Sequence, residues 1–189
     1  MALPYARSIA EEHLYMRLHP CVCGSVAGTG IRHGTGVIAQ GLTSDHEFVC
    51  KGCGAERRFV FRLPGLTPQY DDMYGGPDPS QIIDAGEWRM VALDAMGRAQ
   101  LLRRQSTGVR KIFGRGDQKP QLRRAFEEAL ASYQEMLKFI PPAADTIPDS
   151  AFFTENGRRI RAQEPYVAFE RSFIEAMIDG VRSDLAADG

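Results

Sequence analysis

The chain has 189 residues, of which 43% are hydrophobic and 25% are charged. This is enough apolar material for a folded core, so the composition argues against a disordered chain. The 23 basic and 24 acidic residues give a formal charge of -1, which excludes overall charge as a basis for binding nucleic acid or an anionic membrane.

The first predicted element is a short amphipathic helix over residues 5–18. Its apolar residues recur at roughly helical spacing, while Glu11 and Glu12 suit a solvated face. The helix is expected to end at His19, because Pro20 lacks an amide hydrogen and disfavours helical backbone in the residue before it.

Three short antiparallel strands are predicted next, because hydrophobic runs over residues 36–39, 46–50 and 57–63 are separated by turn residues. The glycines between residues 24 and 41 are expected to form turns of this sheet. They lack the preceding strand and the following Lys-Ser or Lys-Thr of a phosphate-binding loop. Residues 66–79 contain three prolines and are interpreted as a linker or surface loop.

The chain from residue 79 onward is predicted to be mostly helical, with about three helices. The first begins at Ser80, which can cap it, and the second and most regular runs over residues 120–140. The third opens at Pro165, and a glycine-rich basic loop over residues 108–117 separates the first two. We therefore expect an α+β protein in which the first helix and the sheet, residues 1–66, precede a helical region, residues 79–189. The two parts are either separate or packed as one domain.

All four cysteines lie in two tight pairs, namely Cys21 with Cys23 and Cys50 with Cys53. Thiolates this close in sequence can bind one ion together, and zinc favours four tetrahedral ligands. Gly24 and Gly54 each follow the second cysteine of a pair, where the chain turns sharply and a side chain would be in the way. Four thiolates fill the coordination shell and leave no position for a water, so the pattern indicates structural Zn²⁺ and no zinc-hydroxide chemistry.

This arrangement resembles a zinc ribbon, with the two cysteine pairs as its knuckles and the predicted strands as its sheet. The resemblance covers residues 19–63 and implies one structural Zn²⁺ bound by all four thiolates. The first pair departs from it, because ribbons usually have two residues between the cysteines and Cys21 and Cys23 have one. His19 is the substitute ligand if one cysteine does not bind. Redox-active or unliganded thiols, another metal and a pair of disulfides are the alternatives.

A cytoplasmic location is expected. No stretch approaches the roughly 20 apolar residues that span a bilayer, and the start of the chain lacks the pattern of a signal peptide. Paired cysteines in a reducing compartment are more naturally metal ligands than disulfides. On residues 18–21, 82–87 and 137–142 the chain is also similar to uncharacterised bacterial proteins of this layout, which implies a bacterial setting and no particular activity.

The sequence has no recognisable catalytic constellation, so we expect a non-enzymatic protein. His33 and His46 lack an evident carboxylate or nucleophile partner and are expected to be solvated. Asp84 and Glu87 are interpreted as ordinary surface acids on one helix face. An enzyme whose site is assembled from dispersed acids and histidines is the least favoured alternative.

The favoured hypothesis is a protein-binding module, such as an inhibitor, an immunity-like protein or an adaptor, with no membrane association. The main alternative is a nucleic-acid-binding regulator that uses the basic segment 103–124. In that alternative Arg110, Lys111 and Arg115 would contact phosphates.

Overall fold

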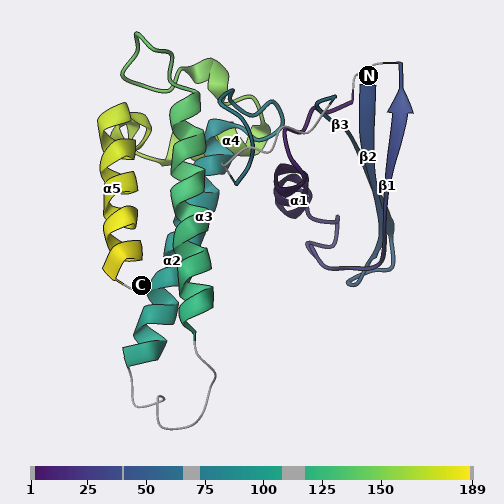
Figure 1. Ribbon diagram of the computed structural model, residues 1–189, viewed down its shortest axis with the longest axis horizontal. Helices are drawn as coiled ribbons and strands as arrows, with labels where there is room; N and C mark the ends of the chain where they lie inside the picture. Colours follow the sequence, from purple (N-terminus) through teal and green to yellow (C-terminus); the bar gives the residue numbers. More distant parts are fainter. Residues whose placement is uncertain (1–2, 40, 66–72, 108–117, 188–189) are drawn as a thin grey trace. The chain divides into compact units, whose positions relative to one another are not determined.

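The computed structural model describes residues 3–39, 41–65, 73–107 and 118–187. The protein is α+β, as predicted, and divides into two compact units, residues 1–83 and 84–189. Among the described residues the N-terminal unit holds one α-helix and a three-stranded sheet, and the C-terminal unit holds helices (Figure 1). Residues 79–83, which the sequence placed in the helical region, group with the N-terminal unit.

The first helix, α1 (Ile9–Leu18), begins at an N-cap and ends at His19, before Pro20. The Oγ of Ser8 accepts a hydrogen bond from the amide of Glu11 at 3.1 Å, which satisfies one of the free amides of the first turn. The prediction of a solvated acidic face is wrong, because Glu11 and Glu12 are both fully buried. The backbone N–H and the guanidinium of Arg7 donate to the Glu11 carboxylate at 2.6 to 3.0 Å and compensate its burial.

The sheet is antiparallel, with strand order β1-β2-β3. Its strands are β1 (Gly28–Ile38), β2 (Gly41–Cys50) and β3 (Glu56–Arg62). The first strand begins well before the predicted residue 36. Its glycines therefore lie within a strand and do not form separate turns, and the pairing of β1 with β2 is interrupted by a bulge between Thr29 and Arg32.

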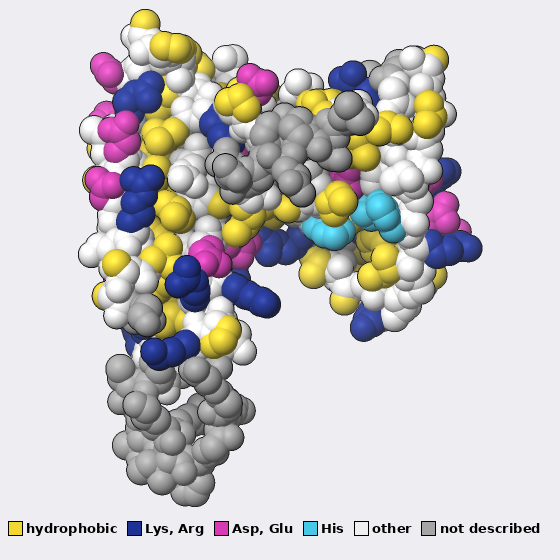
Figure 2. All heavy atoms as spheres, in the orientation of Figure 1, with side chains coloured by type: hydrophobic (Ala, Val, Ile, Leu, Met, Phe, Trp, Pro, Cys, Tyr) yellow, Lys and Arg dark blue, Asp and Glu magenta, His cyan; other side chains and the backbone are white. Residues whose placement is uncertain are grey.

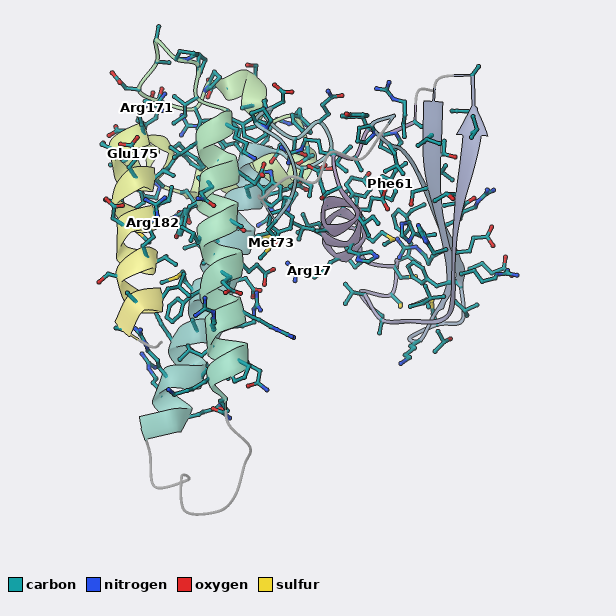
Figure 3. All side chains as sticks on the ribbon, viewed as in Figure 1. Arg17, Phe61, Met73, Arg171, Glu175 and Arg182 are labelled. Atoms are coloured by element: carbon teal, nitrogen blue, oxygen red, sulfur yellow. The ribbon has the colours of Figure 1, made fainter. Side chains whose placement is uncertain are left out.

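The two faces of the sheet differ in character. Toward α1 the sheet presents aromatic rings, among them that of Phe61 (Figure 3). The rings of Tyr15 and Phe61 meet edge to face with centroids 5.5 Å apart. The opposite face carries a ladder of charges, in which Arg58 binds both Asp45 and Glu47. The core of this unit therefore lies on the α1 side of the sheet, where Phe61 is fully buried.

The two edges of the sheet also differ. At the C-terminal end of β3 the start of the chain pairs with its outer edge, since the amide of Ala6 donates to the carbonyl of Arg62 at 3.0 Å and the amide of Arg62 donates to that of Pro4 at 2.8 Å. At the opposite edge, every residue of β1 after Gly28 is exposed. Within the described ranges, β2 is the strand that pairs with β1.

The C-terminal unit has four α-helices among its described residues, and Figure 1 shows the three longest side by side. They are α2 (Ala85–Thr107), α3 (Lys119–Lys138), α4 (Glu155–Gln163) and α5 (Arg171–Ala187). The sequence predicted about three, because α4 lies in a segment that was interpreted as irregular. The last helix begins at Arg171 and not at Pro165, since a 3₁₀ turn, Tyr166–Phe169, comes between.

The start of α2 is capped by Asp84, not by Ser80 as predicted. The amide of Glu87 donates to Oδ1 of Asp84 at 2.9 Å, and the amide of Asp84 donates to Oε2 of Glu87 at 3.2 Å. This is a reciprocal capping box. The interpretation of Asp84 and Glu87 as surface acids is also wrong, since both are buried, and burial raises the pKa of Glu87 to about 7.

The same Asp84 carboxylate ties α2 to the start of α4. Its Oδ2 accepts hydrogen bonds from the amide and from the hydroxyl of Thr154, each at 2.8 Å, and Thr154 is the N-cap of α4. The helices approach closely here because the crossing residues are Gly86 and Gly157. A Cβ on Gly157 would lie 1.9 Å from Oδ2 of Asp84, so glycine is required at this position.

The core of the C-terminal unit is aromatic and aliphatic. Its largest fully buried apolar side chains are Trp88, Phe126, Tyr133, Met136, Ile147, Phe169 and Ile174. Glu135 on α3 is 2% exposed and pairs with Lys138 at 2.7 Å. The regular apolar spacing of α3 was thus read correctly, but one of its acids lies at the border of the core.

Candidate metal centre

The first cysteine pair forms a tight knuckle. The amide of Gly24 donates to the carbonyl of Cys21 at 2.7 Å, and the amide of Cys21 donates to the carbonyl of Ser25 at 3.0 Å. Gly24 has a φ of +82°, a left-handed conformation that side chains disfavour. The chain therefore reverses directly after Cys23.

The second pair repeats this construction with one residue more. The amide of Gly54 donates to the carbonyl of Cys50, and the amide of Cys50 donates to the carbonyl of Ala55, both at 2.9 Å. Gly54 has a φ of +76°, which matches the role of Gly24 in the first pair. The first pair has one residue fewer between its cysteines, so its knuckle is shorter but keeps the same turn.

The two knuckles pack directly against each other. The amide of Lys51 donates to the carbonyl of Ala27 at 2.9 Å and links the second knuckle to the chain that leaves the first. At Gly52, a Cβ would lie 2.9 Å from Sγ of Cys23 and 3.0 Å from Cβ of Ser25. A side chain at Gly52 would therefore force the knuckles apart.

The knuckles bring the four sulfurs together. Sγ of Cys21 lies 3.5 Å from that of Cys53, Sγ of Cys23 lies 3.6 Å from that of Cys50, and all four are within 4.8 Å of one another. Sulfurs about 2.3 Å from a central tetrahedral ion would be roughly 3.8 Å apart. The cluster therefore fits one tetrahedral metal ion, and all four cysteines are free rather than joined in disulfides.

The backbone of the knuckles favours ionised sulfur. The amide of Cys53 lowers the pKa of Cys50 to about 6, and the amide of Cys23 lowers the pKa of Cys21. The amide of Ala55 acts on Cys53 in the same direction, but hydrogen bonds with Cys21 and Cys23 outweigh it and raise the pKa of Cys53 to about 12. A bound cation would remove this opposition, because it neutralises the charge that the four thiolates share.

His19, the substitute ligand of the sequence analysis, lies beside the first knuckle. Its ring stacks on that of Tyr15 with centroids 3.9 Å apart, and its Nδ1 lies 2.8 Å from the carbonyl of Tyr15. Within the described residues, the ligand group at the knuckles consists of the four cysteines. His19 therefore helps to terminate α1, and its role as a ligand stays a prediction.

A second group of ligand-type side chains was missed. Glu12, His33 and His46 have potential ligand atoms within 4.8 Å of one another. The sequence analysis expected both histidines to be solvated. His33 is exposed, but for His46 this is wrong, since it is 3% exposed with its Nε2 2.6 Å from Oε2 of Glu12. The alternation of Phe59 and Phe61 signals a buried sheet face, but only the pairing of β2 with β3 places His46 on it.

The three basic residues of the nucleic-acid hypothesis, Arg110, Lys111 and Arg115, lie outside the described residues. Of the described arginines that flank them, Arg103 and Arg123 are in ion pairs. Arg103 pairs with Asp184 at 2.9 Å, and Arg123 pairs with Glu127 at 2.8 Å. Within the described helices, none combines the length and the hydropathy needed to cross a bilayer.

Comparison with known proteins assigns neither a family nor a function to this chain. No protein-family model, no curated protein and no solved structure matches the chain.

Proposed function

We propose that this chain is a non-enzymatic protein-binding module, of the inhibitor, immunity or adaptor kind, in which structural Zn²⁺ holds the sheet in shape. Zinc is the metal that suits four thiolates at tetrahedral spacing. A shell filled by Cys21, Cys23, Cys50 and Cys53 would leave no position for a reacting water. The proposal places the protein in the cytoplasm, because thiols stay reduced there.

The observation that carries this proposal is the long exposed strand β1. Among the described strands it is the last at one edge of the sheet, and edge strands offer unpaired backbone groups to another chain. Ile31 and Val37 on this strand are 67% and 80% exposed. Such large exposed apolar side chains on one strand favour a protein partner, because binding would remove them from water.

The partner we propose is an extended segment of another protein that pairs with β1. The main chain of such a segment would supply the hydrogen bonds, and its side chains would contact those of β1. The other edge of the same sheet illustrates the geometry, because the segment Pro4–Ala6 already pairs there with Arg62. The cysteine knuckles would matter indirectly, since β2 ends at Cys50 and positions β1 beside it.

The nucleic-acid hypothesis has less support. The overall charge is -1, and two of the described arginines beside the basic loop, Arg103 and Arg123, are already paired with acids. A role in binding DNA or RNA through Arg110, Lys111 and Arg115 would require affinity that falls steeply with salt.

The proposal can be tested with tagged protein purified from the cells that make it. The wild-type chain should retain a companion protein in a one-to-one ratio. The double variant Ile31→Lys/Val37→Lys should lose it, because two charges on β1 would have to be desolvated in the interface. Both side chains are exposed, so the fold should change in stability by less than about 0.5 kcal/mol for each substitution.

Val167→Lys is the matched control, because Val167 is an exposed apolar residue of the C-terminal unit. It should retain the companion as the wild type does. Absence of a companion from the wild type, or equal retention by all three proteins, would contradict the proposal.

A further inference from the structure

Three side chains with metal-binding groups meet on the α1 side of the sheet, away from the cysteines. Glu12 comes from α1, His33 from β1 and His46 from β2. The strand register places His33 directly opposite His46, and their ring centroids are 4.6 Å apart. Three separate elements thus bring one carboxylate and two imidazoles to one point.

Burial gives this group an inner and an outer side. Glu12 and His46 are 0% and 3% exposed, whereas His33 is exposed at the rim. Figure 2 shows histidine side chains at the surface of the N-terminal unit, beside hydrophobic ones. A cavity of about 310 Å³ opens next to His46 and is lined also by His13, Ile31 and Phe48. An ion could therefore reach the group from solvent.

Hydrogen bonds explain only part of the way in which Glu12, His33 and His46 come together. Oε2 of Glu12 accepts from the hydroxyl of Ser44 at 2.8 Å and lies 2.6 Å from Nε2 of His46. Nε2 of His33 lies 3.1 Å from the same hydroxyl. These contacts draw the potential ligand atoms toward one point.

The other oxygen of Glu12, Oε1, is buried and has no hydrogen-bond partner among the described residues. Leaving a buried carboxylate oxygen unpaired costs free energy, and the cost is larger for a charged group. A hydrogen-bonded Glu-His pair alone leaves this cost in place. A cation bound through Oε2 would offset part of it, because the ion neutralises the charge that the two carboxylate oxygens share.

We propose that Glu12, His33 and His46 bind a second metal ion, separate from the one at the cysteine knuckles. Two imidazoles and one carboxylate suit a divalent first-row transition metal such as Zn²⁺, Co²⁺ or Ni²⁺. Three protein ligands leave at least one position for water or for an incoming carboxylate. The site thus differs in kind from the cysteine cluster, whose four sulfurs would fill the shell.

Binding requires only small movements. Ligand atoms of a tetrahedral site with bonds of about 2.0–2.2 Å are roughly 3.3 Å apart. Nε2 of His46 and Oε2 of Glu12 would separate slightly from 2.6 Å, and the exposed His33 would turn inward. The proton between Glu12 and His46 would leave to solvent as the ion replaces it.

Cobalt titration of the metal-free full chain tests this site. The wild type should bind two Co²⁺ ions, one with an intense thiolate-to-cobalt charge-transfer band and one without it. His33→Gln should keep the thiolate band but bind the second ion at least about 100-fold more weakly, because one of three ligands is gone. His33 is exposed, so this variant should fold.

Arg32→Gln is the matched control, since Arg32 is the exposed neighbour of His33 on β1, and it should bind two ions. Glu12→Gln should abolish the second ion, and if this buried change unfolds the chain, His33→Gln still decides. One cobalt per wild-type chain, with the thiolate band present, or a second ion bound equally by His33→Gln, would overturn the proposal. Either outcome would leave the proposed role of β1 and the cysteines untouched.

Discussion

The two units of this protein are held together by different means. Among the largest fully buried side chains, those of the N-terminal unit are Phe61, Ile83, Glu11 and Glu12, so half of them are carboxylates. Those of the C-terminal unit are apolar apart from Glu135. Burying a carboxylate contributes no hydrophobic stabilisation and costs free energy unless it is paired. The N-terminal unit thus depends on specific polar contacts and on its cysteine cluster, whereas the C-terminal unit depends on packing.

The two units also differ in where they hold polar side chains that could bind a ligand. In the N-terminal unit, β1 is exposed after Gly28. Polar side chains can therefore lie at the rim of the sheet face that α1 covers, as the exposed His33 does beside the buried His46. The long helices of the C-terminal unit close over their core, and two of its buried acids, Asp84 and Glu87, serve as caps at the start of α2.

The largest expected effect is the loss of the N-terminal unit when its cysteines cannot bind metal. Cys50→Ser/Cys53→Ser should lose one bound ion per chain and unfold the sheet, because structural zinc contributes about 10–16 kcal/mol in small domains. Trp88 is the chain's one tryptophan and is fully buried in the C-terminal unit. Its fluorescence should stay native while the β-sheet signal in circular dichroism is lost.

Chelation of the wild type is the control for that experiment and should give the same two signals. Full metal content in the double variant would refute the ligand assignment. A change of Trp88 fluorescence together with the loss of the sheet would show that the two units unfold as one, and the contrast between them would fail.

The next effect is confined to the C-terminal unit. Gly157→Ala should lower its free energy of unfolding by roughly 2–4 kcal/mol, because the new Cβ displaces the Asp84 carboxylate from its hydrogen bonds at the starts of α2 and α4. Urea unfolding followed by Trp88 fluorescence measures this change.

Gly180→Ala in α5 is the matched control, since a Cβ there meets nothing within 4 Å. It should stabilise the same unit by up to about 1 kcal/mol, because alanine favours helix more than glycine does. Equal effects of the two substitutions would mean that the contact between Gly157 and Asp84 does not constrain the fold.

The smallest effect is a dependence on pH. The pKa of Glu87 rises from 4.5 to about 7 on folding, so between these values the folded chain keeps a proton that the unfolded chain releases. The free energy of unfolding should therefore fall as pH rises through this window, by at most roughly 3 kcal/mol. Glu87→Gln should remove this decrease, as measured by urea unfolding at pH 5 and pH 7.5 (about the two ends of the window).

Glu175→Gln, at an exposed position of α5, is the control and should follow the wild type. If Glu87→Gln also follows the wild type, the buried capping box does not carry this pH dependence. The buried carboxylates of the two units would then differ less in their roles than the comparison of the units states.

What could be predicted from the sequence is what nearby residues determine. Two cysteine pairs followed by Gly24 and Gly54 indicated a metal-binding cluster, and the apolar spacing of residues 120–140 indicated α3. The start of α2 was missed, although Asp84 and Glu87 have the spacing of a capping box, because Ser80 offers an equally good cap in the sequence. When two nearby residues are both suitable N-caps, only the packing of the folded helix decides between them.

The remaining features depend on residues far apart in the chain. Glu12 is buried because α1 lies over the sheet, and His46 faces it because the register pairs His46 with Phe59 and His33. A shift of one residue would turn His46 to the opposite face. Gly157 is likewise unremarkable in sequence, and only its approach to Asp84 gives it a role.

The four sulfurs of the cysteine cluster are not equivalent. In each knuckle the first cysteine, Cys21 or Cys50, is buried, and the second, Cys23 or Cys53, is exposed. A chelator or an oxidant that approaches an ion held by all four would meet the exposed pair first. The buried pair would hold the ion until last, so loss of the metal would proceed in a fixed order, from the outer thiolates inward.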